Sequence, residues 1–301
     1  MHDAIVVGGG PAGMTSALYL LRAGKTVMIL EKESFGGQIA RSPRLENFPT
    51  NKSISGLEWA DALFNQVVEL GADFDIANVE RIVKKEDGTF DVETDYGTKQ
   101  AKSIIIATGC NHRPLGLDRE EELVGHGISY CATCDGHFFA GKNVLVIGDA
   151  NTALQYTIAL SPTVKSLTLV TLFDRFFADD ILVKRLQNLP NLTVIHNYNA
   201  VEFVGDPELV GVTFEDTVTK EKKTLPCDGA FICIGQIPHN EPFSDFVEME
   251  KGFILTDENM ATKTPGIFAA GDCRVKKIRQ VITASSDGAI AGISCANYLN
   301  S

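Results

Sequence analysis

The chain contains the same strand–turn–helix pattern twice, and the two copies are separated by a constant 140 residues. An apolar run leads into Gly8 in the first copy and into Gly148 in the second. Small residues and a run with helical periodicity follow in both copies. This pattern is typical of the start of a nucleotide-binding domain, in which a buried strand leads through a tight turn into a helix. The repeat therefore predicts two doubly wound, Rossmann-like α/β domains, and 301 residues are enough for both.

The remaining segments indicate how the two domains share the chain. Residues 81–109 alternate between apolar and polar side chains and contain Asp-Gly and Tyr-Gly turn signals, as in a β-meander. Such a meander, added to a parallel sheet and its helices, gives a three-layer ββα domain. The last stretch does not extend the second copy, and we predict that it returns to the first domain. The first domain would then be discontinuous, with residues 1–112 and 242–301, and the second would span residues 113–241.

Composition excludes several classes of partner. Lys and Arg number 27 against 39 Asp and Glu, and the net charge of −12 argues against nucleic acid. No apolar run approaches the ~20 residues that a membrane-spanning helix needs. The N-terminal residues begin directly with a strand-like run and have no basic region or cleavage site, so we expect a cytoplasmic protein without a membrane partner.

The first turn matches the dinucleotide-binding pattern G-x-G-x-x-G. Gly8 permits the tight turn, Gly10 lets the backbone approach a pyrophosphate, and Gly13 lets helix and strand pack closely. Glu31 ends the next strand, where a carboxylate can accept hydrogen bonds from ribose hydroxyls. An acid at this position favours an unphosphorylated ribose, and therefore FAD or NAD rather than NADP. These residues do not distinguish FAD from NAD.

A pair of cysteines precedes the second turn. Cys131 and Cys134 have the C-x-x-C spacing of a dithiol that can close reversibly, and the motif lowers the pKa of one thiol. The alternatives are a zinc site, which usually needs a second such pair, and an inert pair in the core. Asp135 follows directly. A buried carboxyl beside a thiol can carry the proton of each transfer, although Asp135 could instead cap a helix.

The whole chain resembles the low-molecular-weight thioredoxin reductases, a family of flavoproteins with two nucleotide-binding domains. The resemblance is collinear from end to end. Besides "GGGPAG" at 8–13, its motifs are "GGQI" at 36–39, "ENFP" at 46–49, "IIIATG" at 104–109, "YCATCDG" at 130–136, "TPGIFAAGD" at 264–272 and "RQVITASSDG" at 279–288.

The resemblance implies FAD in the first domain, thioredoxin or a thioredoxin-like protein as partner, a homodimer, and no metal. It also implies that Cys134 faces the flavin and Cys131 attacks the partner's disulfide. Asp272 would bond the ribitol chain of FAD. The predicted cofactor-binding residues are Gly8, Gly10, Pro11, Ala12, Gly13, Glu31, Lys32, Gly37, Gln38, Asn47, Thr108, Gly109, Gly271, Asp272, Gln280, Val281 and Ile282.

The second turn departs from the family pattern. Where the family has glycines in its NADPH loop, this chain has Asp149, which adds a negative charge, and Ala150, which adds a methyl group. The His-Arg-Arg that ends the family's next strand, and the Arg four residues later, correspond to Thr171, Leu172, Phe173 and Phe177. Arginine is the residue that binds a 2′-phosphate. We therefore predict that this domain keeps the fold and has lost the pyridine nucleotide.

An alternative is that NAD(P)H still binds through other residues, such as Lys165 or Arg175. A third possibility is a flavin-bound redox sensor whose disulfide reports its state without turnover.

A different electron donor must replace NADPH if the second site is lost. In lacking the arginine motif the chain resembles ferredoxin-dependent thioredoxin reductases, and we predict ferredoxin as the donor. Ferredoxins are usually acidic, as this protein is, so docking requires a local basic patch. The densest basic cluster, residues 274–279, either supplies that patch or is an ordinary solvated face. Its cations are Arg274, Lys276, Lys277 and Arg279.

Overall fold

The computed structural model describes residues 1–42 and 45–301, which form two compact units. The first unit comprises Met1–Asn111 and Ile237–Ser301, and the second comprises His112–Gln236. The first domain is therefore discontinuous. The second crossing lies between residues 236 and 237 rather than at the predicted 241/242. The reason is Asn240, which is buried within the first unit and donates hydrogen bonds to the carbonyls of Gly252 and Cys273, both at 2.8 Å.

The first unit is built on a seven-stranded sheet in the order β3-β2-β1-β6-β5-β4, with β19 also paired with β6. Its first three strands pair in parallel with one another and with β6, whereas β4, β5 and the first half of β6 form an antiparallel meander. The second half of β6 pairs with β1 and β19, so one long strand belongs to both layers. The strands are β1 (His2–Val7), β2 (Val27–Glu31), β3 (Asp73–Ile76), β4 (Val79–Lys84), β5 (Phe90–Thr94), β6 (Gly97–Ile106) and β19 (Ile267–Ala269).

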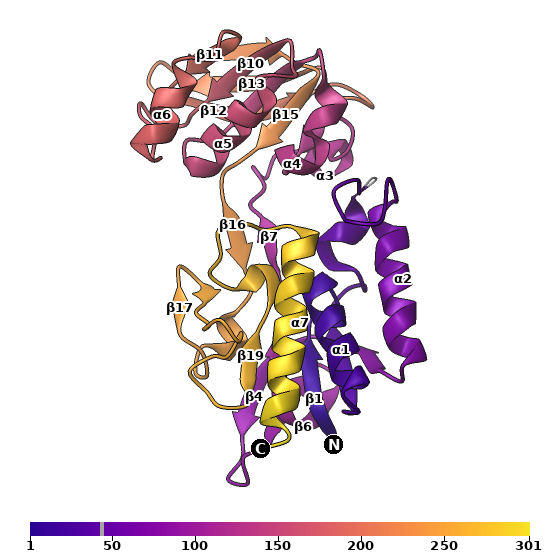
Figure 1. The fold of residues 1–301 in the computed structure, drawn as a ribbon. Coiled ribbons are helices and arrows are strands. Elements are labelled where there is room, and N and C mark those ends of the chain that lie inside the picture. The colour runs from indigo at the N-terminus through magenta and orange to yellow at the C-terminus, as the bar shows by residue number, and fades with distance from the viewer. Residues whose placement is uncertain (43–44) are drawn as a thin grey trace. The chain divides into compact units, whose positions relative to one another are not determined.

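Three long helices cover one face of this sheet: α1 (Pro11–Arg22), α2 (Gly56–Glu69) and α7 (Val281–Tyr298) (Figure 1). Successive residues of β1 point to opposite faces, as the twofold period of a strand requires. Ala4 and Val6 pack against α1 and α7, whereas Ile5 and Val7 pack against the meander. Burial on both sides explains why β1 is apolar throughout.

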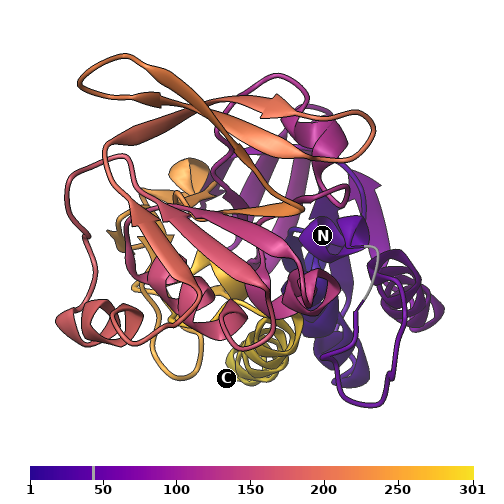
Figure 2. The ribbon, with the colours of Figure 1, turned by 90° about the horizontal axis from the view of Figure 1, so that it is seen from above.

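The second unit repeats this plan. Its five-stranded parallel sheet has the order β11-β10-β9-β15-β8, and a three-stranded antiparallel sheet, β12-β13-β14, forms another layer (Figure 2). Val144 and Val146 of β9 face helix α5, while Leu145 and Ile147 face the antiparallel sheet. The elements are β8 (Ile128–Ser129), β9 (Asn143–Ile147), α5 (Asn151–Leu160), β10 (Ser166–Val170), α6 (Asp180–Leu186), β11 (Leu192–Ile195), β12 (Tyr198–Val204), β13 (Gly211–Asp216), β14 (Lys222–Pro226) and β15 (Gly229–Ile232).

Short elements complete the two units. The first unit contains η1 (Gly37–Arg41), η3 (Glu241–Phe243), β17 (Met249–Glu250), β18 (Phe253–Ile254) and η4 (Gly271–Cys273). The second contains α3 (Glu120–Leu123), α4 (Ala132–Asp135) and η2 (Gly136–Phe139). The crossing strands β7 (Cys110–His112) and β16 (Gln236–Pro238) pair with each other. In the part of the chain that the structure describes, no helix has both the length and the apolar character needed to span a bilayer.

Candidate active site: a disulfide and two nucleotide loops

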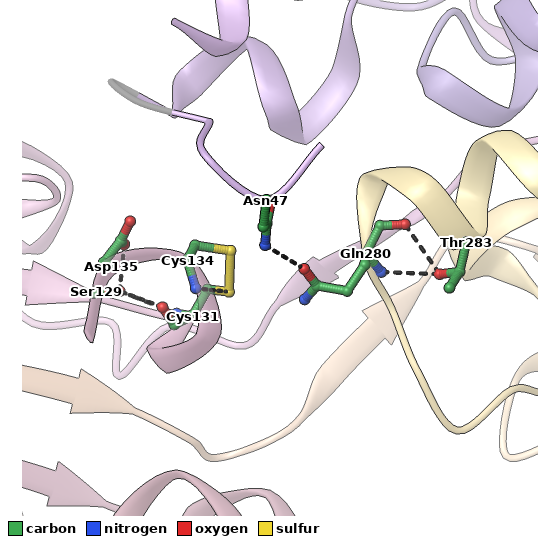
Figure 3. The surroundings of a disulfide bond; sticks show 7 residues. All are labelled: Asn47, Ser129, Cys131, Cys134, Asp135, Gln280 and Thr283. Atoms are coloured by element: carbon green, nitrogen blue, oxygen red, sulfur yellow. Dashed lines mark hydrogen bonds between the residues drawn. A yellow bond between two sulfur atoms is a disulfide. The ribbon is translucent and has the colours of Figure 1, made fainter. Parts of the chain in front are cut away.

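The cysteine pair forms a disulfide directly after strand β8 of the second unit. Cys131 is the N-cap of the short helix α4, and Cys134 lies within that helix. Their Cα atoms are 5.3 Å apart, and the Cys134 amide donates a hydrogen bond to Cys131 Sγ at 3.2 Å (Figure 3). Both residues are partly exposed. The pair is therefore a bridged dithiol at the carboxyl edge of a parallel sheet, where ligands bind in doubly wound folds.

The other cysteines form no such pair. Cys110, Cys227, Cys233, Cys273 and Cys295 are all buried and free. Among the described residues, no cluster of three or more His, Cys, Asp or Glu side chains is arranged to hold a metal ion.

Asp135 lies at the end of α4, and its carboxylate contacts Ser129, two residues before Cys131. The Ser129 hydroxyl donates a hydrogen bond to Asp135 Oδ2 at 2.6 Å (Figure 3). Burial raises the pKa of Asp135, while the bond from Ser129 and the charge of His137 act against that rise. The helix-cap alternative is wrong in this structure, because the Asp135 side chain makes no capping bond to η2, and α4 is capped by Cys131.

The first glycine loop forms a tight turn into α1. Gly8 has a φ of +112°, and a Cβ there would overlap the backbone of Ala107. A Cβ on Gly13 would overlap the Gly8 carbonyl, so these two positions require glycine. A Cβ on Gly10 would meet nothing nearer than the Gly36 carbonyl oxygen at 4.0 Å. The turn therefore leaves open space at the amino end of α1, where unpaired N–H groups can bind a phosphate.

Glu31 is buried at the end of β2 and fixes this loop. Its Oε2 accepts a hydrogen bond from the Gly9 amide at 2.7 Å, and its Oε1 accepts one from the Glu33 amide at 3.0 Å. A carboxylate oxygen can accept two hydrogen bonds, so both retain capacity for ribose hydroxyls. The acid thus has a structural task that the sequence pattern did not indicate.

The remaining predicted cofactor residues approach the loop from several elements. Gly37, in η1, packs against the loop, because a Cβ added to it would lie 3.3 Å from the Gly10 Cα. Asn47 donates a hydrogen bond to the side chain of Gln280, the N-cap of α7, at 3.1 Å (Figure 3). Gly271 packs against α1, because a Cβ added to it would lie only 2.7 Å from the Ala12 Cβ. These contacts bring residues that are more than 200 positions apart in the sequence to the amino ends of α1 and α7.

Other predicted residues are placed less tightly. Gln38 donates a hydrogen bond to Asn111 at 2.6 Å, and Thr108 donates one to Asn240 at 3.0 Å. Pro11 is the first residue of α1, Gly109 follows β6, and Val281 and Ile282 begin α7. Lys32 is exposed, and its ammonium lies 3.6 Å from the Glu33 carboxylate.

Asp272, in η4, has a buried carboxylate oxygen that is an unsatisfied hydrogen-bond acceptor within the described chain. Oδ1 has no hydrogen-bond donor among the described residues, although the Lys276 ammonium lies 3.9 Å away. Burial raises the pKa of Asp272 to about 6, and the charges of Lys276 and Arg279 act against that rise. A buried acceptor without a donor is a costly arrangement that a ligand hydroxyl would relieve.

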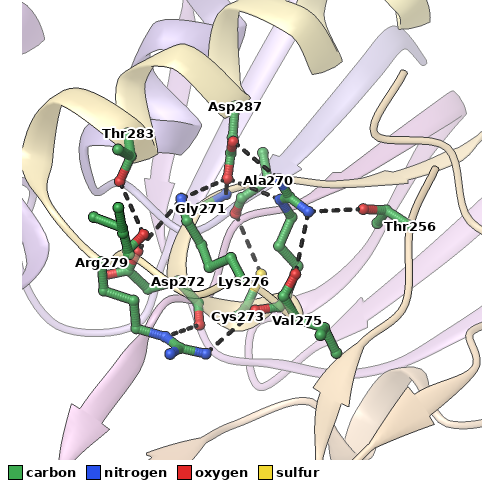
Figure 4. A network of polar contacts seen from close by, with 12 residues as sticks. Thr256, Ala270, Gly271, Asp272, Cys273, Val275, Lys276, Arg279, Thr283 and Asp287 are labelled. Atoms are coloured by element: carbon green, nitrogen blue, oxygen red, sulfur yellow. Dashed lines mark hydrogen bonds and ion pairs between the residues drawn. The ribbon is translucent and has the colours of Figure 1, made fainter. Parts of the chain in front are cut away.

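The basic cluster at residues 274–279 is largely internal. Arg274 and Lys276 both bond the buried carboxylate of Asp287, at 2.8 Å each, and their side chains are 17% and 8% exposed (Figure 4). Arg279 lies over the ring of Phe253, 4.4 Å from its centroid. The buried ion pairs of Arg274 and Lys276 contradict both a docking patch and a solvated face for these two cations, whereas Arg279 is only partly buried. The charges of Arg274 and Lys276 join the segment after η4 to Asp287 of α7.

The second loop also turns into a helix, but its surroundings differ. Gly148 has a φ of +147°, and Ala150 is the N-cap of α5. The Phe177 amide donates a hydrogen bond to the Asp149 carbonyl at 2.7 Å, which joins residues 176–179 to the loop. Burial raises the pKa of the Asp149 side chain. An ionised carboxylate here is unfavourable near phosphates, as the sequence suggested.

The end of β10 has an apolar surface in place of a cationic one. Leu172, Phe173 and Phe177 are 43%, 47% and 51% exposed. The two phenylalanine rings meet edge to face at 5.2 Å, and the Arg175 guanidinium lies 5.2 Å from the Phe177 ring. Thr171 is fully buried and donates a hydrogen bond to the Phe173 carbonyl at 2.7 Å, so its hydroxyl is already engaged.

The two alternative cations for a nucleotide are not equally placed. Lys165 precedes β10, at the opposite end of that strand from Thr171. At about 3.3 Å per residue it is far from the loop, which removes it as a phosphate ligand. Arg175 remains as a cation at this edge.

Comparisons with known proteins agree over the full length. A family model for pyridine nucleotide-disulphide oxidoreductases matches residues 2–288. The thioredoxin reductase of Treponema pallidum is 38% identical over 300 residues, which cover 99% of this chain and 97% of that protein. The chain belongs to the low-molecular-weight thioredoxin reductase family. A 34.2 kDa protein in the rubredoxin operon of Clostridium pasteurianum is also 38% identical, over 99% of this chain and 97% of that protein.

The solved structures lead to the same family. The crystal structure of thioredoxin reductase from Streptococcus pyogenes matches with a TM-score of 0.94 and 35% identity, covering 100% of this chain and 98% of that one. The prediction of two Rossmann-like α/β domains is thereby confirmed.

Members of the low-molecular-weight thioredoxin reductase family bind FAD, and the first unit fits this cofactor. The open amino end of α1 suits a pyrophosphate, Glu31 suits a ribose, and the unpartnered Asp272 Oδ1 suits a polyol hydroxyl. The choice between FAD and NAD at the first loop is thus decided for FAD.

The Asp272 carboxyl gives a pH-dependent prediction for the flavin-free protein. Its pKa is 3.8 ordinarily and about 6 in the folded chain, so the folded state holds the proton more tightly. This favours folding below pH 3.8, and the benefit is lost as pH rises through 6. Asparagine cannot ionise, so Asp272→Asn should raise the free energy of unfolding of the flavin-free protein more at pH 8 than at pH 4. We expect a difference of about 1–2 kcal/mol, because solvent screening of the partly exposed side chain reduces the full effect of the pKa shift.

Urea unfolding at the two pH values measures this difference. Asp61→Asn, at an exposed position of α2, is the control and should show no such difference. Equal effects of the two substitutions would contradict the prediction.

Proposed function

We propose that this member of the family is an FAD-dependent disulfide reductase that reduces thioredoxin or a thioredoxin-like protein, with ferredoxin as its electron donor. The Cys131–Cys134 disulfide at the carboxyl edge of the second sheet is the observation that carries the reductase activity. Relatives over the whole length are named thioredoxin reductases, which supports thioredoxin as the substrate. In this proposal the unit of residues 1–111 and 237–301 binds FAD, and the unit of residues 112–236 carries the disulfide.

The residues of the chain have distinct tasks in this reaction. Bound FAD would accept two electrons and make them available to the disulfide. The Cys131 thiolate then attacks the partner's disulfide, and Cys134 attacks Cys131 to release the reduced partner. Asp135, with its raised pKa, holds and releases a proton beside the sulfurs.

The altered second loop supports a donor other than NADPH. Hydrogen bonds to charged groups contribute roughly 1.5–3 kcal/mol each, so the loss of two arginines costs about 3–6 kcal/mol. This corresponds to a loss of about 10²–10⁴ in affinity. The exposed apolar side chains at Leu172, Phe173 and Phe177 offer a 2′-phosphate no compensation.

Ferredoxin is thermodynamically sufficient. The reduction potential of thioredoxin is about −270 mV, and that of a low-potential ferredoxin is about −400 mV. For two electrons this difference corresponds to about 6 kcal/mol. Ferredoxin delivers one electron at a time, so the enzyme must collect two before the disulfide is reduced.

Two alternatives rest on particular features. Arg175, whose guanidinium lies 5.2 Å from the Phe177 ring centroid, supports an NADPH-dependent enzyme with an atypical site. A redox sensor would keep the disulfide and lack turnover. Catalytic thioredoxin reduction by any donor excludes the sensor.

We also propose a homodimer in the cytoplasm, as expected from the family. Exposed apolar side chains on the helical face of the first unit, Tyr19 of α1 and Ile293 of α7, support an interface there. Sedimentation velocity measures the assembly state, and a monomer at micromolar concentration contradicts this part of the proposal.

The donor is tested by anaerobic reduction of the purified yellow protein. We expect micromolar NADPH or NADH to leave the flavin absorbance unchanged. Photoreduced ferredoxin should bleach it and sustain thioredoxin reduction. Rapid bleaching by micromolar NADPH would refute the donor proposal while leaving the disulfide reductase intact.

A further inference from the structure

Ser129 is a buried residue whose hydroxyl links the cysteine motif to its acid. It ends strand β8 and is 3% exposed. Its Oγ donates a hydrogen bond to Asp135 Oδ2 at 2.6 Å and accepts one from the Cys131 amide at 3.0 Å (Figure 3). One hydroxyl thus contacts both the backbone of one cysteine and the carboxylate beside the other. Neither the C-x-x-C spacing nor the cofactor motifs assign it a role.

We propose that Ser129 is a positioning residue, whose hydroxyl fixes the Asp135 carboxylate and the Cys131 backbone so that Asp135 can relay a proton during disulfide exchange. This inference rests on the proposed reductase function of Cys131 and Cys134. A hydroxyl makes both bonds at once because it is a donor and an acceptor together. Alanine at this position would remove both bonds.

The exchange between the dithiol and the partner's disulfide conserves both protons and both electrons. In the reduced protein, Cys131 as thiolate attacks one sulfur of the partner's disulfide and releases the other sulfur as a thiolate. Cys134 then attacks Cys131 Sγ, which restores the disulfide and releases the second partner sulfur. The two protons of the dithiol end on the two released sulfurs, and one of them passes through the Asp135 carboxyl.

The hydrogen bond from Ser129 opposes the effect of burial on the pKa of Asp135. Burial raises the pKa of this carboxyl, and the hydrogen bond from Ser129 lowers it. Of the groups that face it from neighbouring elements, His137 of η2 lowers it through its charge. Tyr156 of α5 has a pKa raised to about 12, so it is neutral at physiological pH. Loss of the Ser129 hydroxyl should therefore raise the pKa of Asp135.

The test follows the alkylation of Cys131 by iodoacetamide in the reduced, flavin-containing protein across the pH range in which it stays folded, read by mass spectrometry. We expect two inflections in the wild-type rate, one from the thiol and a lower one from Asp135. In Ser129→Ala the lower inflection should move upward by about one pH unit, as the loss of a bond to a charged group implies. Ser129→Thr, which keeps the hydroxyl, should restore it.

Four further variants make the result specific. Ser161→Ala is the matched control, because Ser161 is also buried in this unit and donates to Asn191 Oδ1 at 2.6 Å. It should leave the profile unchanged. Asp135→Asn should lack the lower inflection, and adding Ser129→Ala to it should change nothing. His137→Gln removes the side chain whose charge also acts on Asp135, and it should leave the Ser129→Ala shift intact.

Two results overturn the inference: a Ser129→Ala profile that coincides with wild type, or an equal shift in Ser161→Ala. The readout concerns the dithiol itself, so it is independent of the electron donor. Absence of thioredoxin reduction in the wild type would refute the proposed function. An unshifted Ser129→Ala profile in an active enzyme would refute the positioning role alone.

Discussion

Replacement of either Cys131 or Cys134 by serine is expected to lower thioredoxin turnover by at least roughly a thousandfold. Each sulfur of the observed disulfide is half of the group that carries the two electrons. A hydroxyl can neither form the disulfide nor act as a comparable nucleophile at neutral pH. Turnover with dithionite-reduced ferredoxin measures the loss. Cys227→Ala, at a buried free cysteine of the same unit, is the control and should stay within threefold of wild type.

The two serine variants should differ in what they trap. Cys134→Ser keeps Cys131 as the attacking thiolate but lacks the residue that resolves the product. It should therefore accumulate a mixed disulfide with thioredoxin, visible by non-reducing mass spectrometry. Cys131→Ser should form little of this adduct. The reverse pattern would exchange the roles that we assign to the two cysteines, and substantial turnover in either variant would contradict the mechanism.

The glycine and cysteine motifs were predictable from the sequence because local geometry determines them. The positive φ of Gly8 and the close approach of Gly13 to the Gly8 carbonyl are constraints that only glycine meets, so the pattern itself predicts the turn. The C-x-x-C spacing likewise brings two sulfurs within bonding distance on one helical turn. Features of this kind depend on neighbours in sequence.

Features that depend on distant partners were not predictable in the same way. Arg274 and Lys276 suggested a basic surface, because the sequence alone does not reveal that both bond Asp287 from α7. Asp287 is the one charged residue of helix 281–298, and this was the available signal for a buried ion pair. Asn240 shifted the domain boundary for a similar reason, since its bonds reach residues 252 and 273. Ser129 was missed because a serine before the motif is unremarkable without its two contacts.

The repeat explains both the likeness and the difference of the two nucleotide loops. In both units the strand before the loop is buried on two faces, so packing maintains the fold regardless of what the loop binds. The residues around the loop, in contrast, face solvent and can change without loss of the core. Phe173 and Phe177 are at such positions, and Ala150 is partly exposed. A domain can therefore lose a coenzyme and keep its structure.

Restoring the family's residues at the second loop should restore NADPH binding. In the triple variant Ala150→Gly, Phe173→Arg and Phe177→Arg, the two new guanidiniums replace exposed phenylalanine rings at the end of β10. Two charged hydrogen bonds of roughly 1.5–3 kcal/mol each predict an affinity gain of about 10²–10⁴ over wild type. Isothermal titration with NADPH measures the gain, and NADH should benefit far less because it lacks the 2′-phosphate.

The gain in NADPH affinity should depend on where the two arginines lie and not only on the charge that they add. Val210→Arg with Val124→Arg adds the same two charges to the same unit, at side chains that are 57% and 40% exposed. This control should leave NADPH binding unchanged, because both positions lie next to the β8 end of the sheet, which β9 and β15 separate from β10. Tight NADPH binding by the wild-type protein would show that Arg175 already serves the 2′-phosphate. An unimproved triple variant would instead place the obstacle in Asp149, whose carboxylate would still face the phosphates.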